Sequence, residues 1–151
     1  MKSQGIDHVA IVVKDMDRAV ETLSSLFEVE FREIVEAKER LGVRISVSVP
    51  DLQLELMSVV DAAKAKSSSH GREIAEFAER VGEGIYRIFV KVEDAEAAMA
   101  DAERQGIATG RKVEEKLLGG FIPHFKEVTF SRQSGLPVYV IGLIEYVNRK
   151  N

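Results

Sequence analysis

An internal repeat constrains the fold of this chain more than any other feature of its sequence. Residues 5–15 read G-I-D-H-V-A-I-V-V-K-D, and residues 84–94 read G-I-Y-R-I-F-V-K-V-E-D, a constant offset of 79 residues. Apolar side chains alternate along each segment, which is the pattern of a β-strand with one buried face. Two copies of one plan in a chain of 151 residues indicate two related modules.

The repeat continues into a helix in each half. Apolar residues recur at helical spacing and keep the same offset: Met16, Ala19, Val20 and Leu23 in the first half, and Ala95, Ala98, Met99 and Ala102 in the second. Asp15 and Asp94 stand directly before these stripes, where a short acidic side chain caps the first turn. We therefore expect one helix to begin after each aspartate, and Gly106 to end the second helix.

Strand-like sequence follows both helices. The expected strands are 29–35, 43–49 and 52–58 in the first half and 108–115, 125–131 and 138–146 in the second. The expected turns are Pro50-Asp51, Gly119-Gly120 and Ser134-Gly135. The alternating charges of residues 33–40 predict a solvated strand and turn. Each half is thus predicted to be a βαβββ module.

The predicted organisation is one structural domain of the α+β class. Residues 1–60 form the first module, 61–83 a polar loop and a connector helix, and 84–151 the second module. The connector helix is predicted from the apolar stripe of Ile74, Phe77, Ala78 and Val81, which Gly82 and Gly84 close. Residues 61–71, rich in Lys and Ser, are expected to be a mobile loop.

Composition narrows the classes of partner. A formal net charge of −4 and a pI near 5.5 argue against nucleic acid as the main ligand. No apolar run approaches the roughly 20 residues that span a bilayer, and no secretory signal opens the chain. The absence of cysteine excludes disulfides, thiolate catalysis and zinc–thiolate sites. We expect a cytoplasmic protein with a small-molecule ligand and no membrane partner.

Two stretches of sequence resemble one known family. Residues 6–20 read I-D-H-V-A-I-V-V-K-D-M-D-R-A-V, and residues 72–94 read R-E-I-A-E-F-A-E-R-V-G-E-G-I-Y-R-I-F-V-K-V-E-D. Together with the paired βαβββ plan, they resemble the vicinal oxygen chelate superfamily, which includes glyoxalases, bleomycin-resistance proteins and extradiol dioxygenases. Within it, the sequence is most similar to methylmalonyl-CoA epimerases. The resemblance implies a cup-shaped, mostly antiparallel sheet with helices outside, and a homodimer, which is common among relatives.

The resemblance also implies a divalent-metal site, which this sequence retains only in part. In the family, four side chains on four strands hold the ion, and the ion stabilises an enolate oxygen of the substrate. His8 and Glu55 stand at the first two ligand positions. Arg87 stands where the family has a second histidine, and the fourth position falls on Gly142, or on Ile141 if one residue is gapped. None of these three can bind a metal.

The predicted ligand pocket therefore consists of His8, Gln53, Glu55, Arg87, Phe89 and Gly142. No cofactor is expected, with a divalent metal held by His8 and Glu55 as the alternative, and no residue is assigned a catalytic role. Arg87 is predicted either to form an ion pair with Glu55 at the vacated metal position or to anchor an anionic ligand, and both roles are compatible.

The predicted function is binding of a small carbonyl, carboxylate or acyl-thioester compound by a glyoxalase-like protein with an incomplete metal site. One alternative is a metal-dependent isomerase or lyase of the epimerase or glyoxalase type, with His124 and Glu127 as replacement ligands. Another is a non-catalytic binding or resistance protein.

Overall fold

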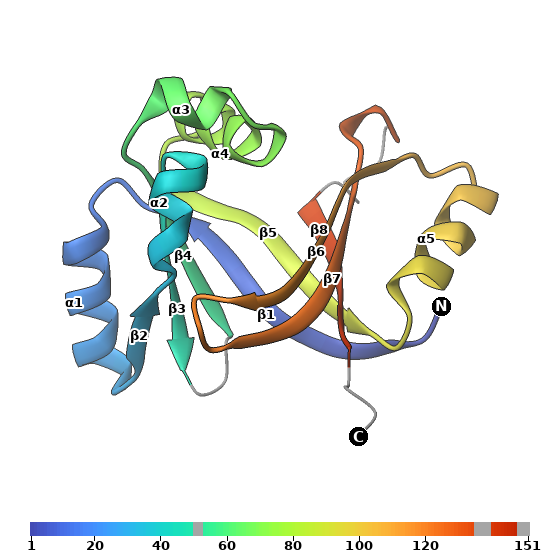
Figure 1. Cartoon of the computed structure of the whole chain (residues 1–151), viewed down its shortest axis with the longest axis horizontal. Coiled ribbons are helices and arrows are strands. Elements are labelled where there is room, and N and C mark those ends of the chain that lie inside the picture. The colour runs from blue at the N-terminus through green and yellow to red at the C-terminus, as the bar shows by residue number, and fades with distance from the viewer. Residues whose placement is uncertain (50–52, 135–139, 148–151) are drawn as a thin grey trace. The chain divides into compact units, whose positions relative to one another are not determined.

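The computed structural model describes residues 1–49, 53–134 and 140–147 of the chain. These residues form two compact units (Figure 1). The N-terminal unit consists of His8–Tyr86, and the C-terminal unit combines Met1–Asp7 with Arg87–Asn151. Among the described residues, no helix is both long and apolar enough to cross a membrane.

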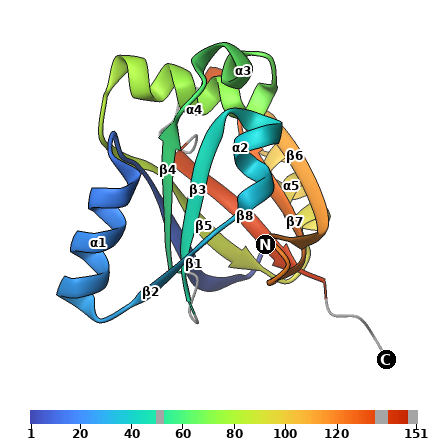
Figure 2. The same ribbon diagram turned by 60° about the vertical axis from the view of Figure 1, so that its left-hand side comes forward.

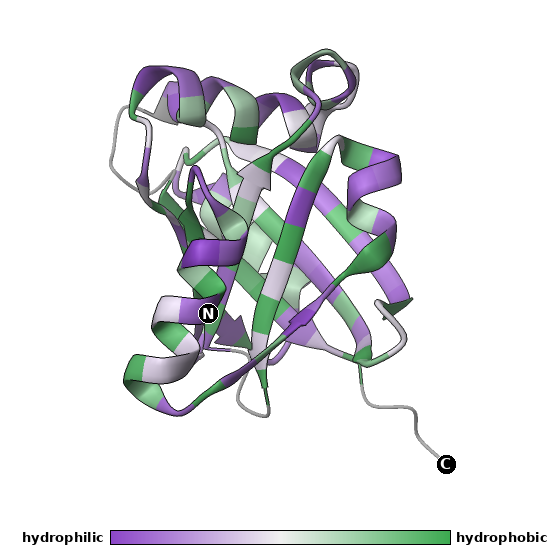
Figure 3. Cartoon of the chain, turned by 90° about the vertical axis from the view of Figure 1, so that its left-hand side faces the viewer, coloured by the Kyte–Doolittle hydropathy of each residue, from purple (hydrophilic) through white to green (hydrophobic). Residues whose placement is uncertain are grey.

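The N-terminal unit is a four-stranded sheet with helices. Its elements are β1 (Ser3–Val12, of which the first residues belong to the C-terminal unit), α1 (Met16–Phe27), β2 (Glu30–Glu33), α2 (Val35–Leu41), β3 (Val43–Val49), β4 (Leu54–Val59), α3 (Ala62–Lys66) and α4 (Ser69–Arg80). The strands lie in the order β2-β3-β4-β1. The pairs β2–β3 and β3–β4 are antiparallel, whereas β1 and β4 are parallel. Along β3, hydrophobic segments alternate with hydrophilic or neutral ones (Figure 3).

The C-terminal unit repeats the order of one strand, one helix and three strands, and its described residues include no counterparts of α2, α3 and α4. Its elements are β5 (Gly84–Val92), α5 (Ala95–Arg104), β6 (Thr109–Leu118), β7 (Ile122–Phe130), a short 3₁₀ helix (Arg132–Ser134) and β8 (Ile141–Tyr146). The strand order is β5-β8-β7-β6, with β5 and β8 parallel and the other pairs antiparallel. The predicted α+β class, mostly antiparallel pairing and glyoxalase-like order of elements are confirmed.

Both predicted helix caps are confirmed. The Asp15 carboxylate accepts a hydrogen bond from the backbone N–H of Arg18 at 3.0 Å, and the Asp94 carboxylate accepts one from Ala97 at 2.9 Å. Each bond satisfies a backbone donor that the first helical turn leaves open. In the C-terminal unit α5 then packs its alanines on the sheet, in a core of Val92, Ala95, Ala98, Ala102, Val128, Phe130 and Leu143.

Helix α2 differs from the expected strand and turn at residues 33–40. The alternating charges there are the exposed face of a short helix, and Ala37 supplies its buried face. The helix ends at Gly42, which has a left-handed φ of 63° and donates its N–H to the Lys38 carbonyl at 3.1 Å. A Cβ at Gly42 would lie 2.5 Å from the Asp61 carbonyl oxygen, so both conformation and space require glycine there.

The connector is helical where a mobile polar loop was expected. Asp61 caps α3 through the Lys64 N–H at 2.9 Å, and Ser68 caps α4 through the Gly71 N–H at 3.0 Å. Ala65 is fully buried between these helices. The expected helical stripe is confirmed in α4 at Ile74, Phe77 and Ala78, whereas Val81 follows the helix and is exposed. Helix α4 lies beside α3 (Figure 2). The predicted turn at Pro50-Asp51 lies outside the described residues, as does Gly135 of the Ser134-Gly135 turn.

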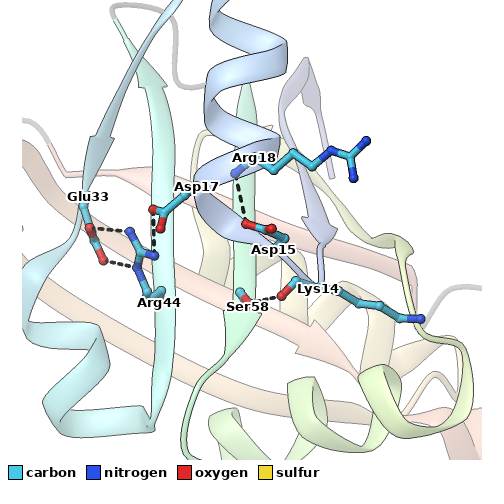
Figure 4. A network of polar contacts seen from close by, with 7 residues as sticks. All are labelled: Lys14, Asp15, Asp17, Arg18, Glu33, Arg44 and Ser58. Atoms are coloured by element: carbon cyan, nitrogen blue, oxygen red, sulfur yellow. Dashed lines mark hydrogen bonds and ion pairs between the residues drawn. The ribbon is translucent and has the colours of Figure 1, made fainter.

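A charged network joins three elements of the N-terminal unit (Figure 4). The Arg44 guanidinium on β3 donates to both carboxylate oxygens of Glu33, at 2.8 and 3.1 Å, and to Asp17 of α1 at 3.0 Å. These hydrogen bonds raise the pKa of Arg44 above its ordinary value, Glu33 being the largest cause. The bidentate pair with Glu33 holds the end of β2 against β3, and the single hydrogen bond to Asp17 holds the start of α1.

Candidate ligand site

The strand register reproduces the sequence repeat residue by residue. In the N-terminal unit, the parallel β1–β4 partners are Val9↔Leu54, Ala10↔Glu55, Ile11↔Leu56 and Val12↔Met57. In the C-terminal unit, the β5–β8 partners are Ile88↔Ile141, Phe89↔Gly142, Val90↔Leu143 and Lys91↔Ile144. Every β5 residue is 79 positions after its β1 counterpart, and every β8 residue is 87 after its β4 counterpart. Gly142, and not Ile141, is therefore the counterpart of Glu55.

The N-terminal unit brings together two of the predicted pocket residues. His8 Nε2 lies 3.1 Å from Glu55 Oε2, and their side chains are only 11% and 16% exposed. Ala10, the register partner of Glu55, is fully buried and follows His8 on the same face of β1. A partly desolvated carboxylate requires a hydrogen-bond donor, and the His8 ring supplies one when Nε2 carries its proton.

The C-terminal unit carries three other predicted pocket residues on one sheet face. Arg87 and Phe89 alternate along β5, and Gly142 is the β8 partner of Phe89. Arg87 is 6% exposed and Phe89 is 3% exposed. This face presents a buried guanidinium and an aromatic ring at the positions where the N-terminal unit presents His8 and Ala10.

Gln53 differs from the other predicted pocket residues in that its side chain is exposed. It directly precedes β4, and its carbonyl oxygen accepts the Val9 N–H at 2.8 Å. Its contribution to the fold is thus a backbone hydrogen bond that extends the β1–β4 pairing.

The two replacement ligands, His124 and Glu127, do not converge. Both lie within β7, and residues three apart on a strand point to opposite faces. His124 pairs with Glu114 at 2.7 Å, whereas Glu127 pairs with Arg111 at 2.7 Å. The His124 hydrogen bond lowers the pKa of the exposed Glu114 carboxyl. Each side chain is therefore engaged in a separate charge pair.

Sequence reasoning missed the Arg111–Glu127 pair. Register places Thr129 beside Gly142, and Glu127 beside Ile144, so both lie on the sheet face of Gly142. The Arg111 side chain is 7% exposed, and its backbone N–H donates to the Thr129 hydroxyl at 2.9 Å. A bulge in β6 between Thr109 and Lys112 positions this arginine. Gly110 within that bulge is a sequence signal for it, since a Cβ there would lie 2.9 Å from the Thr129 hydroxyl oxygen.

A four-ligand metal site does not fit the side chains present. Where the family has two histidines and two carboxylates or amides, this chain has His8, Glu55, Arg87 and Gly142. A guanidinium is permanently charged and cannot coordinate a cation. Glycine has no side chain and so provides no side-chain ligand for a metal. Within residues 1–49, 53–134 and 140–147, no group of three or more His, Asp or Glu side chains is suited to hold a metal ion.

The sequence model of the glyoxalase/bleomycin resistance protein/dioxygenase superfamily matches residues 7–121, which is more than half of the chain. The chain belongs to this superfamily. No curated protein sequence matches it. The superfamily match agrees with the resemblance found in the sequence and with the paired order of elements.

Solved structures similar to this superfamily member include methylmalonyl-CoA epimerases. The epimerase from Mycobacterium tuberculosis is 22% identical, with a TM-score of 0.73 over 97% of this chain and 90% of that chain. A Streptomyces coelicolor epimerase in complex with 2-nitronate-propionyl-CoA is 18% identical, with a TM-score of 0.72 over 97% and 100%. A hypothetical protein from Bacillus halodurans is 16% identical, with a TM-score of 0.73 over 100% and 99%. At these identities the likeness shows the fold.

Proposed function

We propose that this superfamily member binds a small carbonyl, carboxylate or acyl-thioester compound without a catalytic divalent metal, in the pocket that the family fold provides. One observation carries the proposal. Of the four family ligand positions, only His8 and Glu55 have side-chain atoms that can coordinate a metal, and these two side chains lie within hydrogen-bonding distance of each other. The third position carries the buried Arg87.

The buried Arg87 favours an anionic ligand. A guanidinium offers planar paired donors that match a carboxylate, and such charge-assisted hydrogen bonds are about twice as strong as neutral ones. Relatives of the same fold have been solved with methylmalonyl-CoA and with 2-nitronate-propionyl-CoA. Both ligands are acyl thioesters with an anionic acyl group, so the proposed ligand class overlaps with theirs in chemistry. We also propose a homodimer.

The metal-dependent isomerase is the weaker alternative. It needs further ligands besides His8 and Glu55, and the candidates His124 and Glu127 point to opposite faces of β7 and are engaged with Glu114 and Arg111. A non-catalytic binding or resistance protein remains compatible with the proposal, because both need a pocket and neither needs a metal.

Native mass spectrometry of the purified protein tests the proposal. We expect a mass above that of the chain by one small organic anion, which denaturation releases, and a lower occupancy of that ligand in Arg87→Met. Lys112→Met, at an exposed position of β6, is the matched control and should retain the ligand. A spectrum that shows added divalent metal and no organic anion would support the isomerase alternative instead.

A further inference from the structure

Gly142 has no room for a side chain. A Cβ there would lie 2.3 Å from Cε1 and 2.5 Å from Cδ1 of Phe89, and 3.2 Å from Cδ of Arg87. Non-bonded carbon atoms prefer separations of about 3.5–4.0 Å. Gly142 is absent from the glycines with positive φ, so its backbone is ordinary strand. Space, and not backbone conformation, therefore requires glycine at this position.

At equivalent positions, the two units place the larger side chain of a strand pair on opposite strands. In the N-terminal unit, the β1 residue is small (Ala10) and its β4 partner carries a carboxylate (Glu55). In the C-terminal unit, the β5 residue is large (Phe89) and its β8 partner has no side chain (Gly142). The Phe89 ring is almost fully buried in a close-packed interior, so it cannot move aside without displacing its neighbours.

We propose that Phe89 and Gly142 form an interlocked pair that closes the fourth ligand position of the family to any side chain. The Phe89 ring takes the volume that a coordinating side chain would need, so this position offers an apolar surface in place of an oxygen donor. The inference deepens the proposed function and rests on it, because Phe89 explains why position 142 has no side chain that could coordinate a metal.

A double-mutant cycle on thermal unfolding tests the pair. Gly142→Ala in the parent chain should lower Tm by roughly 5–10 °C, since the added methyl group overlaps the ring. In the Phe89→Ala background, the same substitution should leave Tm unchanged or raise it, because alanine suits a strand better than glycine once space is free. If Phe89→Ala does not fold, Phe89→Leu provides the same comparison, with partial relief expected.

A second aromatic deletion provides the matched control. Phe125 is buried on β7 and pairs with Tyr146, four residues along β8 from Gly142. In the Phe125→Ala background, Gly142→Ala should keep its full loss of Tm. Equal losses in the parent and Phe89→Ala backgrounds, or no loss in the parent, would overturn the interlock. That result would not contradict the proposed ligand binding, because native mass spectrometry measures the retained ligand independently.

Discussion

Replacing Arg87 by alanine should lower the free energy of unfolding by about 3 kcal/mol or more, as for a broken buried ion pair. Arg87 is 6% exposed, so truncation removes both its packed methylene groups and a buried positive charge. Urea denaturation measures the change. Arg18→Ala is the control, since the Arg18 side chain is exposed and points away from the charged network (Figure 4), and should change stability by less than about 0.5 kcal/mol.

A second cycle tests the predicted partner of Arg87. If Arg87 pairs with Glu55 at the position of the family metal, Arg87→Met and Glu55→Gln should couple by about 1 kcal/mol or more. Arg87→His should harm stability less than Arg87→Ala, because a protonated imidazole preserves part of the charge. If the stability changes of the two substitutions are additive, Glu55 is not the partner of Arg87. An Arg87→Ala protein as stable as the parent would refute a structural role for the buried charge.

Methylmalonyl-CoA epimerase turnover should be negligible, in spite of the shared fold. Epimerisation requires stabilisation of an enolate oxygen, which a divalent metal supplies in the family, and positions 87 and 142 carry no ligand for one. Solvent deuterium incorporation at C2 of methylmalonyl-CoA, followed by NMR, measures the reaction. The M. tuberculosis epimerase is the positive control. A turnover number of about 1 s⁻¹ or above, within the usual enzyme range, would contradict this expectation.

The parts of the fold that could be predicted are those that repeat. The offset of 79 residues aligns the sequence of β1 with that of β5 and predicts the helix caps Asp15 and Asp94. The structure confirms both caps. Alternating apolar residues predicted β3 over 43–49 with the bounds that the structure has. Sequence alignment cannot decide whether the fourth ligand position is Gly142 or Ile141, because it does not fix the position of a gap. The hydrogen-bond register shows that it is Gly142.

The features that escaped prediction depend on contacts between segments distant in sequence. Helix α2 and helix α3 are short, and their stability comes from Gly42, which approaches the Asp61 carbonyl, and from the buried Ala65. The closure of position 142 by Phe89 likewise appears only once β5 and β8 are paired. Residue types at positions 87 and 142 could be read from the sequence, whereas the volume available to them could not.

Elemental analysis of the protein purified without chelators measures whether the four family ligand positions hold a metal ion. If His8, Glu55, Arg87 and Gly142 cannot hold a divalent ion, the protein should contain well under one equivalent of zinc, cobalt, nickel and manganese in total. The Glu55→Ala variant is the matched control and should show the same background content. A stoichiometric metal in the parent chain that disappears in Glu55→Ala and in His8→Ala would contradict the account.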